Sequence, residues 1–473
     1  MIIWGFLRKG VLKTLTHSDL IKCGKDEEKR MRLVETAILD FQQSEEYKWA
    51  EKASKYYDIE NPEIEAVEKI IYDMKGIAHR DLISPNNKIR NGYFPSIIDG
   101  HVSHLLANGI SFSDGKKKKL GNDFDDVSKA IYREALICRC SYGFYNGEKT
   151  VRLPYLNTAQ LVDDYTGALT DAVYYSQIAD NKPKVYTLYE PDGFTEYVQE
   201  ENERMEIKTP KTPYSYFSVG NAAEGEYFRM FDDGSRLPIM PMYSKNKKSM
   251  LVGSLDKLVA IDLMSSQLVN NVSQSELIYW VLKNYGGMDN IADANFIVNI
   301  IKSHIIHVDD DGSAEPHQIT VPFDANDAAF RRLKSELYLC MHGVDHEVLR
   351  SGNPTATEIE SAYTEQRNFS GIMESHVFDY VRGIMDIAGI DSNETITVEY
   401  NETINTSEAI QNTIASAQWL GDTATTKRLA MLNGLSDEYE EIMKEKAAEQ
   451  IMQFNAPDNA QDNADGGSDG LEV

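Results

Sequence analysis

The sequence has few cysteines, and they are widely spaced. The four in 473 residues are Cys23, Cys138, Cys140 and Cys340. This number is too small for a disulfide framework, and a reducing cytoplasm is the simple interpretation. Cys138 and Cys140 are separated by one residue and no second pair follows, so they lack the spacing of a zinc site and we expect them to pack in the interior.

Long hydrophobic runs are also missing. No window approaches the roughly 18 uninterrupted apolar residues that a membrane span requires. The apolar residues 1–7 come before Arg8 and Lys9, whereas a secretory signal begins with its positive charge. We therefore expect a soluble protein without a visible export signal and without a membrane partner.

Basic residues are scarce relative to acidic ones. The chain has 48 Lys and Arg against 75 Asp and Glu, which gives a formal net charge of −27. Ordinary DNA binding relies on Lys and Arg to neutralise phosphates, so this balance argues against it and suits a protein that keeps a polyanion from sticking. The 42% of hydrophobic residues is normal for a globular protein, and the length allows two or more domains.

The usual motifs of enzymes are absent from the sequence. It has no phosphate-binding G-x-x-x-x-G-K-[ST] loop and no G-x-S-x-G nucleophile motif. Residues 143–150 contain Gly147, Lys149 and Thr150, but the glycine and lysine are not adjacent as a phosphate loop requires. We predict that the chain is not an enzyme and needs no cofactor.

Two small groups of residues are candidates for metal binding. Asp123, Asp125 and Asp126 could form a carboxylate cluster, although the N-terminus of a helix enriched in Asp explains them without chemistry. His101 and His104 could share a helix face, but no nearby Cys or further carboxylate completes a ligand set. We predict no metal site in the chain.

The central part of the chain, residues 254–341, contains two amphipathic helices. Ser254 is a plausible N-cap of the first, and the second begins near Asp324 or Asn326. Each is apolar along one stripe only, so antiparallel packing covers part of that surface and the rest needs another partner. The stripes consist of Leu258, Ile261, Met264, Leu268 and Val272, and of Phe330, Leu333, Leu337 and Met341.

A compact insert separates these two helices. Residues 276–285 are aromatic and β-branched enough for a strand, and a short helix is expected over 291–302. Residues 305–308 and 318–321 would pair as a hairpin around the turn at 309–312.

Helices and strands also alternate in the rest of the chain. We predict helices over 26–57, 124–140 and 357–387, a β-rich region over 142–231, a strand over 395–400 and short helices after residue 407. The β-rich strands include 155–156, 173–175, 185–189 and 214–219. The fold class is therefore α+β.

The order of these elements resembles the core of a tailed-bacteriophage portal protein of the siphophage type. In both, a helix, a small α/β insert, a second helix, a glycine-containing loop and a longer helix follow one another. The phrase IYWVLKNYG at residues 278–286 and the dipeptide VP at 321–322 are also similar to that family.

The resemblance implies a division of the chain into the parts of a portal fold, assembled as a ring. These parts are the wing (1–245), stem helix 1 (246–274), the clip (275–323), stem helix 2 (324–342), the tunnel loop (343–356), the spine helix with a wing strand (357–404), a helical crown (405–452) and a disordered acidic tail (453–473).

It also implies a function. About twelve copies would form a closed ring at the capsid vertex of the virion, after assembly in the host cytoplasm. Double-stranded DNA would be packaged and later ejected through the ring. The expected partners are the terminase large subunit, which would hydrolyse ATP, then a head–tail adaptor, and the major capsid and scaffolding proteins. A ring of this size carries a charge of order −300, which repels phosphates from its bore.

The same resemblance points to two groups of site residues. Those expected to face the channel and its DNA are Lys334, His346, Arg350, Ser351 and Asn353. Those expected to bind partners at the clip are Tyr285, Met288, Asp289 and Asp310.

Two other functions remain open at this point. One is an acidic metal-dependent hydrolase that uses Asp123, Asp125 and Asp126, and the other is a monomeric acidic binding protein. The native mass separates a ring from both alternatives.

Overall fold

The computed structural model describes residues 15–72, 76–81, 84–113, 115–201, 203–218, 226–229, 236–275, 279–283, 313–317, 323–345, 347, 356–390, 394–401, 406–419, 421–432, 439 and 442–446. The chain divides into two units, each considered by itself. The first comprises Met1–His346 and Tyr363–Asn401, and the second Glu347–Ala362 and Glu402–Val473.

The N-terminal helical region contains a break that the sequence pattern did not predict. The expected helix over 26–57 is two helices, because Ser44 has an extended backbone and its side chain accepts a hydrogen bond from the Tyr47 N–H at 3.1 Å. This bond caps a new helix. The helices are α1 (His17–Cys23), α2 (Glu27–Gln43), α3 (Glu45–Tyr57) and α4 (Pro62–Glu65).

The main core lies around a three-stranded sheet with the order β13-β4-β5. Helices α5 and α6 and the later part of α11 contribute buried side chains to it, among them Ile98, Tyr132 and Tyr380. These elements are α5 (Tyr93–Leu106), α6 (Phe124–Cys138), α11 (Ala356–Ile387), β4 (Cys140–Tyr145), β5 (Thr150–Leu153) and β13 (Ile239–Tyr243). The helices predicted over 124–140 and 357–387 are confirmed.

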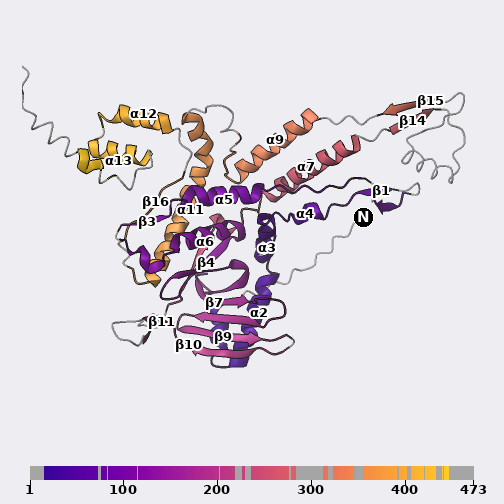
Figure 1. Ribbon diagram of the computed structural model, residues 1–473. Helices are drawn as coiled ribbons and strands as arrows, with labels where there is room; N and C mark the ends of the chain where they lie inside the picture. Colours follow the sequence, from indigo (N-terminus) through magenta and orange to yellow (C-terminus); the bar gives the residue numbers. More distant parts are fainter. Residues whose placement is uncertain are drawn as a thin grey trace, which may run out of the picture. The chain divides into compact units, whose positions relative to one another are not determined.

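A second core lies between α2 and an antiparallel five-stranded sheet (Figure 1). Leu33, Val34, Ala37 and Ile38 of α2 are buried against this sheet, whose order is β10-β9-β8-β7-β6. The strands are β6 (Thr158–Val162), β7 (Leu169–Ser176), β8 (Lys184–Glu190), β9 (Gly193–Gln199) and β10 (Glu206–Thr212). The strands predicted at 173–175 and 185–189 are confirmed, but 155–156 lies in a short 3-10 helix, η2 (Tyr155–Asn157).

Four two-stranded sheets complete the strands that the structure describes. They pair β1 (Ile70–Tyr72) with β2 (Ala78–Arg80), β3 (Ile110–Phe112) with β16 (Ile396–Val398), β11 (Ser215–Ser218) with β12 (Glu226–Arg229), and β14 (Tyr279–Lys283) with β15 (Ser313–His317). The predicted strand at 276–285 thus pairs with 313–317, a segment that was not predicted to be a strand. The predicted hairpin strands at 305–308 and 318–321 lie outside the described residues, as does the predicted helix at 291–302.

Two long helices of the first unit, α7 (Leu255–Ser275) and α9 (Phe323–Cys340), run side by side (Figure 1). They confirm the pair of amphipathic helices predicted from the sequence. The remaining short 3-10 helices are η1 (Lys116–Leu120) and η3 (Lys245–Lys247), and the second unit contains α12 (Thr406–Ser416) and α13 (Asp422–Leu432).

The contact between β4 and α11 leads to a first prediction. A Cβ atom on Gly143 would lie 2.8 Å from Tyr380 Cε2, and the Tyr380 side chain is buried and cannot easily move. Gly143→Ala should therefore lower the free energy of unfolding by about 1–3 kcal/mol, as overpacking does. Denaturant unfolding followed by tryptophan fluorescence measures the change.

Gly371→Ala is the matched control, because a Cβ at this position of α11 meets nothing within 4 Å. It should be neutral or stabilise by about 0.5–1 kcal/mol. Equal destabilisation by the two variants would show that the Gly143–Tyr380 contact is not the cause.

Candidate functional site

Helices α7 and α9 pack antiparallel, as the hydrogen bond between their ends shows. Cys340 Sγ, at the end of α9, lies 3.4 Å from the carbonyl oxygen of Gly253, just before α7 begins. Ser254 directly precedes α7 as predicted, but its hydroxyl donates to the Met250 carbonyl at 2.9 Å. Along the predicted stripes, burial is complete or nearly so near the core, at Leu258, Ile261, Leu337 and Met341, and Val272 is exposed.

Helix α7 also makes a row of polar contacts, with the extended segment 87–91. Three of its side chains, four residues apart, accept hydrogen bonds from alternate backbone N–H groups of the extended segment 87–91. Four helical residues rise about 6 Å, and two extended residues span about 6.6 Å, so the two spacings match. The bonds join the N–H groups of Asn91, Ile89 and Asn87 to Asp262, Ser266 and Asn270 at 2.9, 2.9 and 2.8 Å, respectively. We call this set the α7 ladder.

Asp262 is the most heavily bonded member of the α7 ladder. It is 1% exposed and also accepts hydrogen bonds from the side-chain amides of Asn61 at 2.5 Å and Asn91 at 2.9 Å. Burial raises the pKa of Asp262, and the hydrogen bonds from Asn91 and Asn61 oppose that rise. The buried carboxylate of Asp262, with its three hydrogen-bond donors, fixes the rotation of α7 about its axis. Turning the helix would leave this carboxylate buried without hydrogen bonds, which is costly.

Beyond Asp262, α7 contains no charged residue as far as its end at Ser275. Val269 and Val272 are each 40% exposed in this part of the helix. An uncharged surface with apolar residues can be buried against another protein without desolvating an ion.

Helix α9 differs from α7 because two of its most exposed side chains are charged. Arg331 and Arg332 have side chains that are 76% and 83% exposed, and they pair with Asp327 at 2.9 Å and Glu336 at 3.1 Å on the same helix. Ion pairs of this exposed kind contribute little to stability. The guanidinium groups therefore stay accessible to another charged molecule.

Lys334 lies on the inner side of α9. It is 9% exposed, its ammonium group lies 3.1 Å from the Asp345 carboxylate, and it also lies 5.8 Å from the centre of the Tyr338 ring. In the single chain Lys334 is thus a buried and ion-paired residue, and the exposed cations of α9 are Arg331 and Arg332. The predicted contact of Lys334 with DNA stays a prediction.

The other predicted site residues lie outside the described residues. This holds for the channel residues His346, Arg350, Ser351 and Asn353 and for the clip residues Tyr285, Met288, Asp289 and Asp310.

The end of α9 is held against α5. His342 has a left-handed backbone (φ 53°), and the Gly343 N–H donates to the Tyr338 carbonyl at 2.8 Å, as in a helix C-cap. His101 Nε2, on α5, lies 2.8 Å from the Met341 carbonyl oxygen. Burial lowers the pKa of His101 to about 4, so the ring is neutral near pH 7 and its Nε2–H donates this bond.

Helix α5 also holds α11. His104 Nδ1 lies 2.8 Å from the Ser370 hydroxyl, and the Gln366 amide donates to the Gly100 carbonyl at 3.1 Å. The two histidines that the sequence places on one face of α5 therefore bind different partners, Met341 just after α9 and Ser370 on α11. In the described part of the chain, no group of three or more His, Cys, Asp or Glu side chains is arranged to hold a metal ion.

The three clustered aspartates are engaged separately. Asp123 pairs with Lys149 at 3.3 Å, and Asp126 is 86% exposed and lies 3.9 Å from Lys129. Asp125 pairs with Lys117 of η1 and accepts the Ile110 N–H at 3.1 Å. These contacts secure loops around α6, and the structure does not bring the three carboxylates together as a catalytic site.

A comparison with protein families decides the assignment. The family model described as "Phage portal protein, SPP1 Gp6-like" matches residues 38–452, which is most of the chain. The chain belongs to the SPP1 Gp6-like phage portal proteins. This confirms the resemblance found in the sequence. Portal proteins of this family are structural proteins of the virion at the capsid vertex, without enzymatic activity, and serve DNA packaging.

One curated relative and two solved structures are similar to this portal protein. The "Portal protein" of Clostridium phage phiCD119 is 21% identical over 369 residues, which cover 71% of this chain and 79% of the relative. Chains from the necks of native and empty GTA particles are 10% and 11% identical, with a TM-score of 0.39 in each case. They cover 71% of this chain and 87% and 88% of those chains. At this TM-score they add nothing to the assignment.

The sequence predicts no membrane-spanning segment in this portal protein. Among the helices within the described ranges, none has the length and apolar character needed to span a bilayer.

The α7 ladder predicts an alternating pattern of amide exchange. The N–H groups of Asn87, Ile89 and Asn91 should exchange with solvent at least about tenfold more slowly than those of Lys88 and Arg90. Ser266→Ala should release the Ile89 amide, and Asn270→Ala the Asn87 amide. Hydrogen–deuterium exchange with residue-level mass spectrometry measures these rates.

Ser273→Ala is the control for the ladder, because its hydroxyl donates only to the Val269 carbonyl of its own helix at 3.0 Å. It should leave the exchange of residues 87–91 unchanged. A uniform rise over 87–91 in every variant would contradict the residue-by-residue pairing.

His101 predicts a pH dependence of stability. Its pKa is about 4 in the folded chain and near the ordinary 6.5 when unfolded, so the unfolded chain binds the proton first. Its contribution is complete above pH 6.5 and declines as the pH falls towards 4, with a loss of about 2 kcal/mol between pH 7 and 5. His101→Gln keeps a donor for Met341 and should remove this part of the decline in denaturant titrations. An unchanged pH profile in the variant would show that another group titrates.

Proposed function

We propose that this portal protein closes into a ring in which α7 and α9 of successive copies form the wall of a channel for double-stranded DNA. The observation that supports the proposal most is that different sides of α7 have different contacts. One side is held by the α7 ladder and another by α9, so its position is set within one chain. The uncharged side with Val269 and Val272 is then available to a neighbouring copy.

Further apolar groups support a self-association surface. Leu339, near the end of α9, is 61% exposed, and Phe323, at its start, is 53% exposed. In a closed ring each copy presents one such surface to the next copy, and about twelve copies satisfy every interface without a free end.

Charge would let DNA move through such a channel. With −27 on each copy, the ring carries a charge of order −300 before counterions, which opposes tight binding of phosphates. The exposed Arg331 and Arg332 would add brief contacts with the DNA backbone. We keep Lys334, His346, Arg350, Ser351 and Asn353 as further proposed channel residues.

Lys334 would reach such a channel only if its ion pair with Asp345 opens. That pair joins α9 to the start of the proposed tunnel loop, residues 343–356, so its first role would be to set where this loop begins.

The clip, residues 275–323, is the proposed docking region for the terminase large subunit during packaging and for a head–tail adaptor afterwards. Its described part is the β14–β15 pair, whose strands lie between α7 and α9 in the chain. Tyr285, Met288, Asp289 and Asp310 are the proposed partner contacts. The wing and crown would contact the major capsid and scaffolding proteins.

The exposed valines of α7 provide the test of this function. Val269→Glu combined with Val272→Glu places two carboxylates on the proposed interface, where burial of an unpaired charge is costly. The purified variant should run as a monomer or small oligomer in native mass spectrometry, and the wild type at about twelve times the subunit mass.

Ile178→Glu is the matched control, because Ile178 is an exposed apolar residue of the wing, with 96% exposure. It should leave the ring intact. A wild-type protein that remains monomeric at micromolar concentration, or a valine variant that still forms the ring, would overturn the proposed interface.

A further inference from the structure

A cavity of about 470 Å³ lies beside the short 3-10 helix η3, which precedes α7. Its volume is within the roughly 300–1,000 Å³ that is usual for binding pockets. Trp49, Cys138 and Val252 give it an apolar part, and Lys247 and Lys248 line its charged part. We call it the lysine cavity.

The lysine cavity has an excess of positive charge. Glu45 and Glu46 also line it, but each of these carboxylates already has a basic partner, at 3.5 and 3.8 Å, respectively. Within the described ranges, neither Lys247 nor Lys248 pairs with a carboxylate. Because the chain has a net charge of −27, two such lysines in one cavity are available to carboxylates of another molecule.

The backbone around the lysine cavity is strained at three residues. Arg139, Asn246 and Lys247 have φ values of 98°, 57° and 52°, in the left-handed region that side-chain-bearing residues rarely adopt. The Arg139 carbonyl accepts the Ser244 N–H at 2.9 Å, which holds the start of η3 in place. Arg139 Nε is buried and has no hydrogen-bond partner in the part of the chain that the structure describes. Backbone strain of this kind concentrates at binding sites, where the surrounding structure maintains it.

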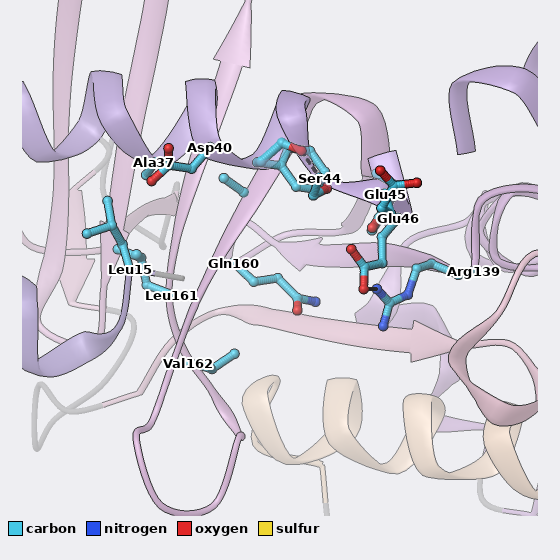
Figure 2. A pocket seen from close by; sticks show the side chains of 13 residues that line it. Leu15, Ala37, Asp40, Ser44, Glu45, Glu46, Arg139, Gln160, Leu161 and Val162 are labelled. Carbon is cyan, nitrogen blue, oxygen red and sulfur yellow. Dashed lines mark hydrogen bonds and ion pairs between the residues drawn. The ribbon is translucent and has the colours of Figure 1, made fainter. Parts of the chain in front are cut away.

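A second cavity, of about 440 Å³, follows strand β6 and shares Glu46 and Arg139 with the lysine cavity. Figure 2 shows Arg139 beside Glu46 at one end, Gln160 in the middle and Leu161 at the other end. The turn between β6 and β7 follows Val162, so it lies beyond the Leu161 end. A strand of five residues spans about 16 Å, so this turn and the lysine cavity lie too far apart to meet within one chain.

The turn between β6 and β7, residues 163–168, has the complementary chemistry. It contains Asp163 and Asp164, and the Tyr165 side chain is 97% exposed. The Asp163 carboxylate accepts hydrogen bonds from the N–H groups of Tyr165 and Thr166 at 3.0 and 2.8 Å, which makes the turn rigid. We call it the acidic turn. An aromatic ring between carboxylates matches a cavity with apolar and cationic sides.

We propose that the lysine cavity of one copy binds the acidic turn of a neighbouring copy. Tyr165 would pack against Trp49 and Val252. The two carboxylates of the turn would pair with Lys247 and Lys248. Each copy would offer one turn and one cavity at opposite ends of β6, so the contact is head-to-tail, and a closed ring satisfies it without a free end. The proposal rests on the proposed ring and adds the wing to its subunit interface.

Photo-crosslinking of the full-length protein tests this contact. Tyr165→p-benzoylphenylalanine, assembled from an equal mixture of light and ¹⁵N-labelled chains, should cross-link near Trp49 or Val252 in mixed-isotope products. Ile178→p-benzoylphenylalanine is the matched control, because Ile178 is 96% exposed in the connection between β7 and β8 of the same sheet. It should give no product at the lysine cavity.

Charge reversal tests the ion pairs. Lys247→Glu combined with Lys248→Glu should lower the yield of the cross-link from position 165 at least about tenfold, because like charges would then face each other. Lys182→Glu combined with Lys184→Glu makes the same charge change at two exposed lysines outside the cavity and should leave the yield unchanged. Equal yields in the two double variants would overturn the proposed ion pairs.

Native mass spectrometry of the same samples separates this contact from the proposed ring. A complete ring without a mixed-isotope product at the lysine cavity, or with products within one isotope class only, would overturn the contact and leave the ring standing. A protein that stays monomeric and gives no product between copies would overturn both.

Discussion

The hydrogen bonds of the α7 ladder are the constraint on which the rest of the structure depends. A long helix with one apolar stripe can rotate or slide on its neighbour, because hydrophobic contact has no direction. Three acceptors on α7 matched to alternate N–H groups of an extended segment remove that freedom. A slip by one residue would leave a buried Asp262 and several donors unpaired, at a cost of several kcal/mol.

The positions of the neighbouring helices depend on the fixed position of α7. Helix α9 packs on α7, and the carbonyl group of Met341, the residue that follows α9, is bound by His101. Because α5 also binds α11 through His104 and Gln366, the same helix connects the end of α9 to α11. The apolar and uncharged surface left on α7 is then presented in one orientation, as the proposed closed ring would require of each copy.

The sequence predicted the parts whose signal is periodic. The apolar spacing of α7, α9, α6 and α11 was sufficient to locate these helices, because burial of one stripe repeats every three to four residues. The prediction of secondary structure failed where local contacts, and not a periodic pattern, determine the backbone conformation. Ser44 ends one helix and caps the next, and residues 155–156, although aromatic and apolar, form a 3-10 turn.

The candidate site was harder to predict than the fold. The polar residues Asp262, Ser266 and Asn270 recur at helical spacing beside the apolar stripe, and this signal could have revealed a second buried face. Their partner is a segment about 180 residues earlier in the chain, which helical spacing cannot identify. Lys334 reads as one of three basic residues on α9, and only the fold distinguishes it, buried on Asp345, from the exposed Arg331 and Arg332.

The most direct test of this account is an electron cryomicroscopy reconstruction of the purified full-length protein. The account predicts a closed ring of about twelve copies around an open channel, with α7 and α9 of adjacent copies side by side in its wall and the valine surface of α7 buried between them. A particle without a central channel, or a ring in which Val269 and Val272 face solvent, would contradict it.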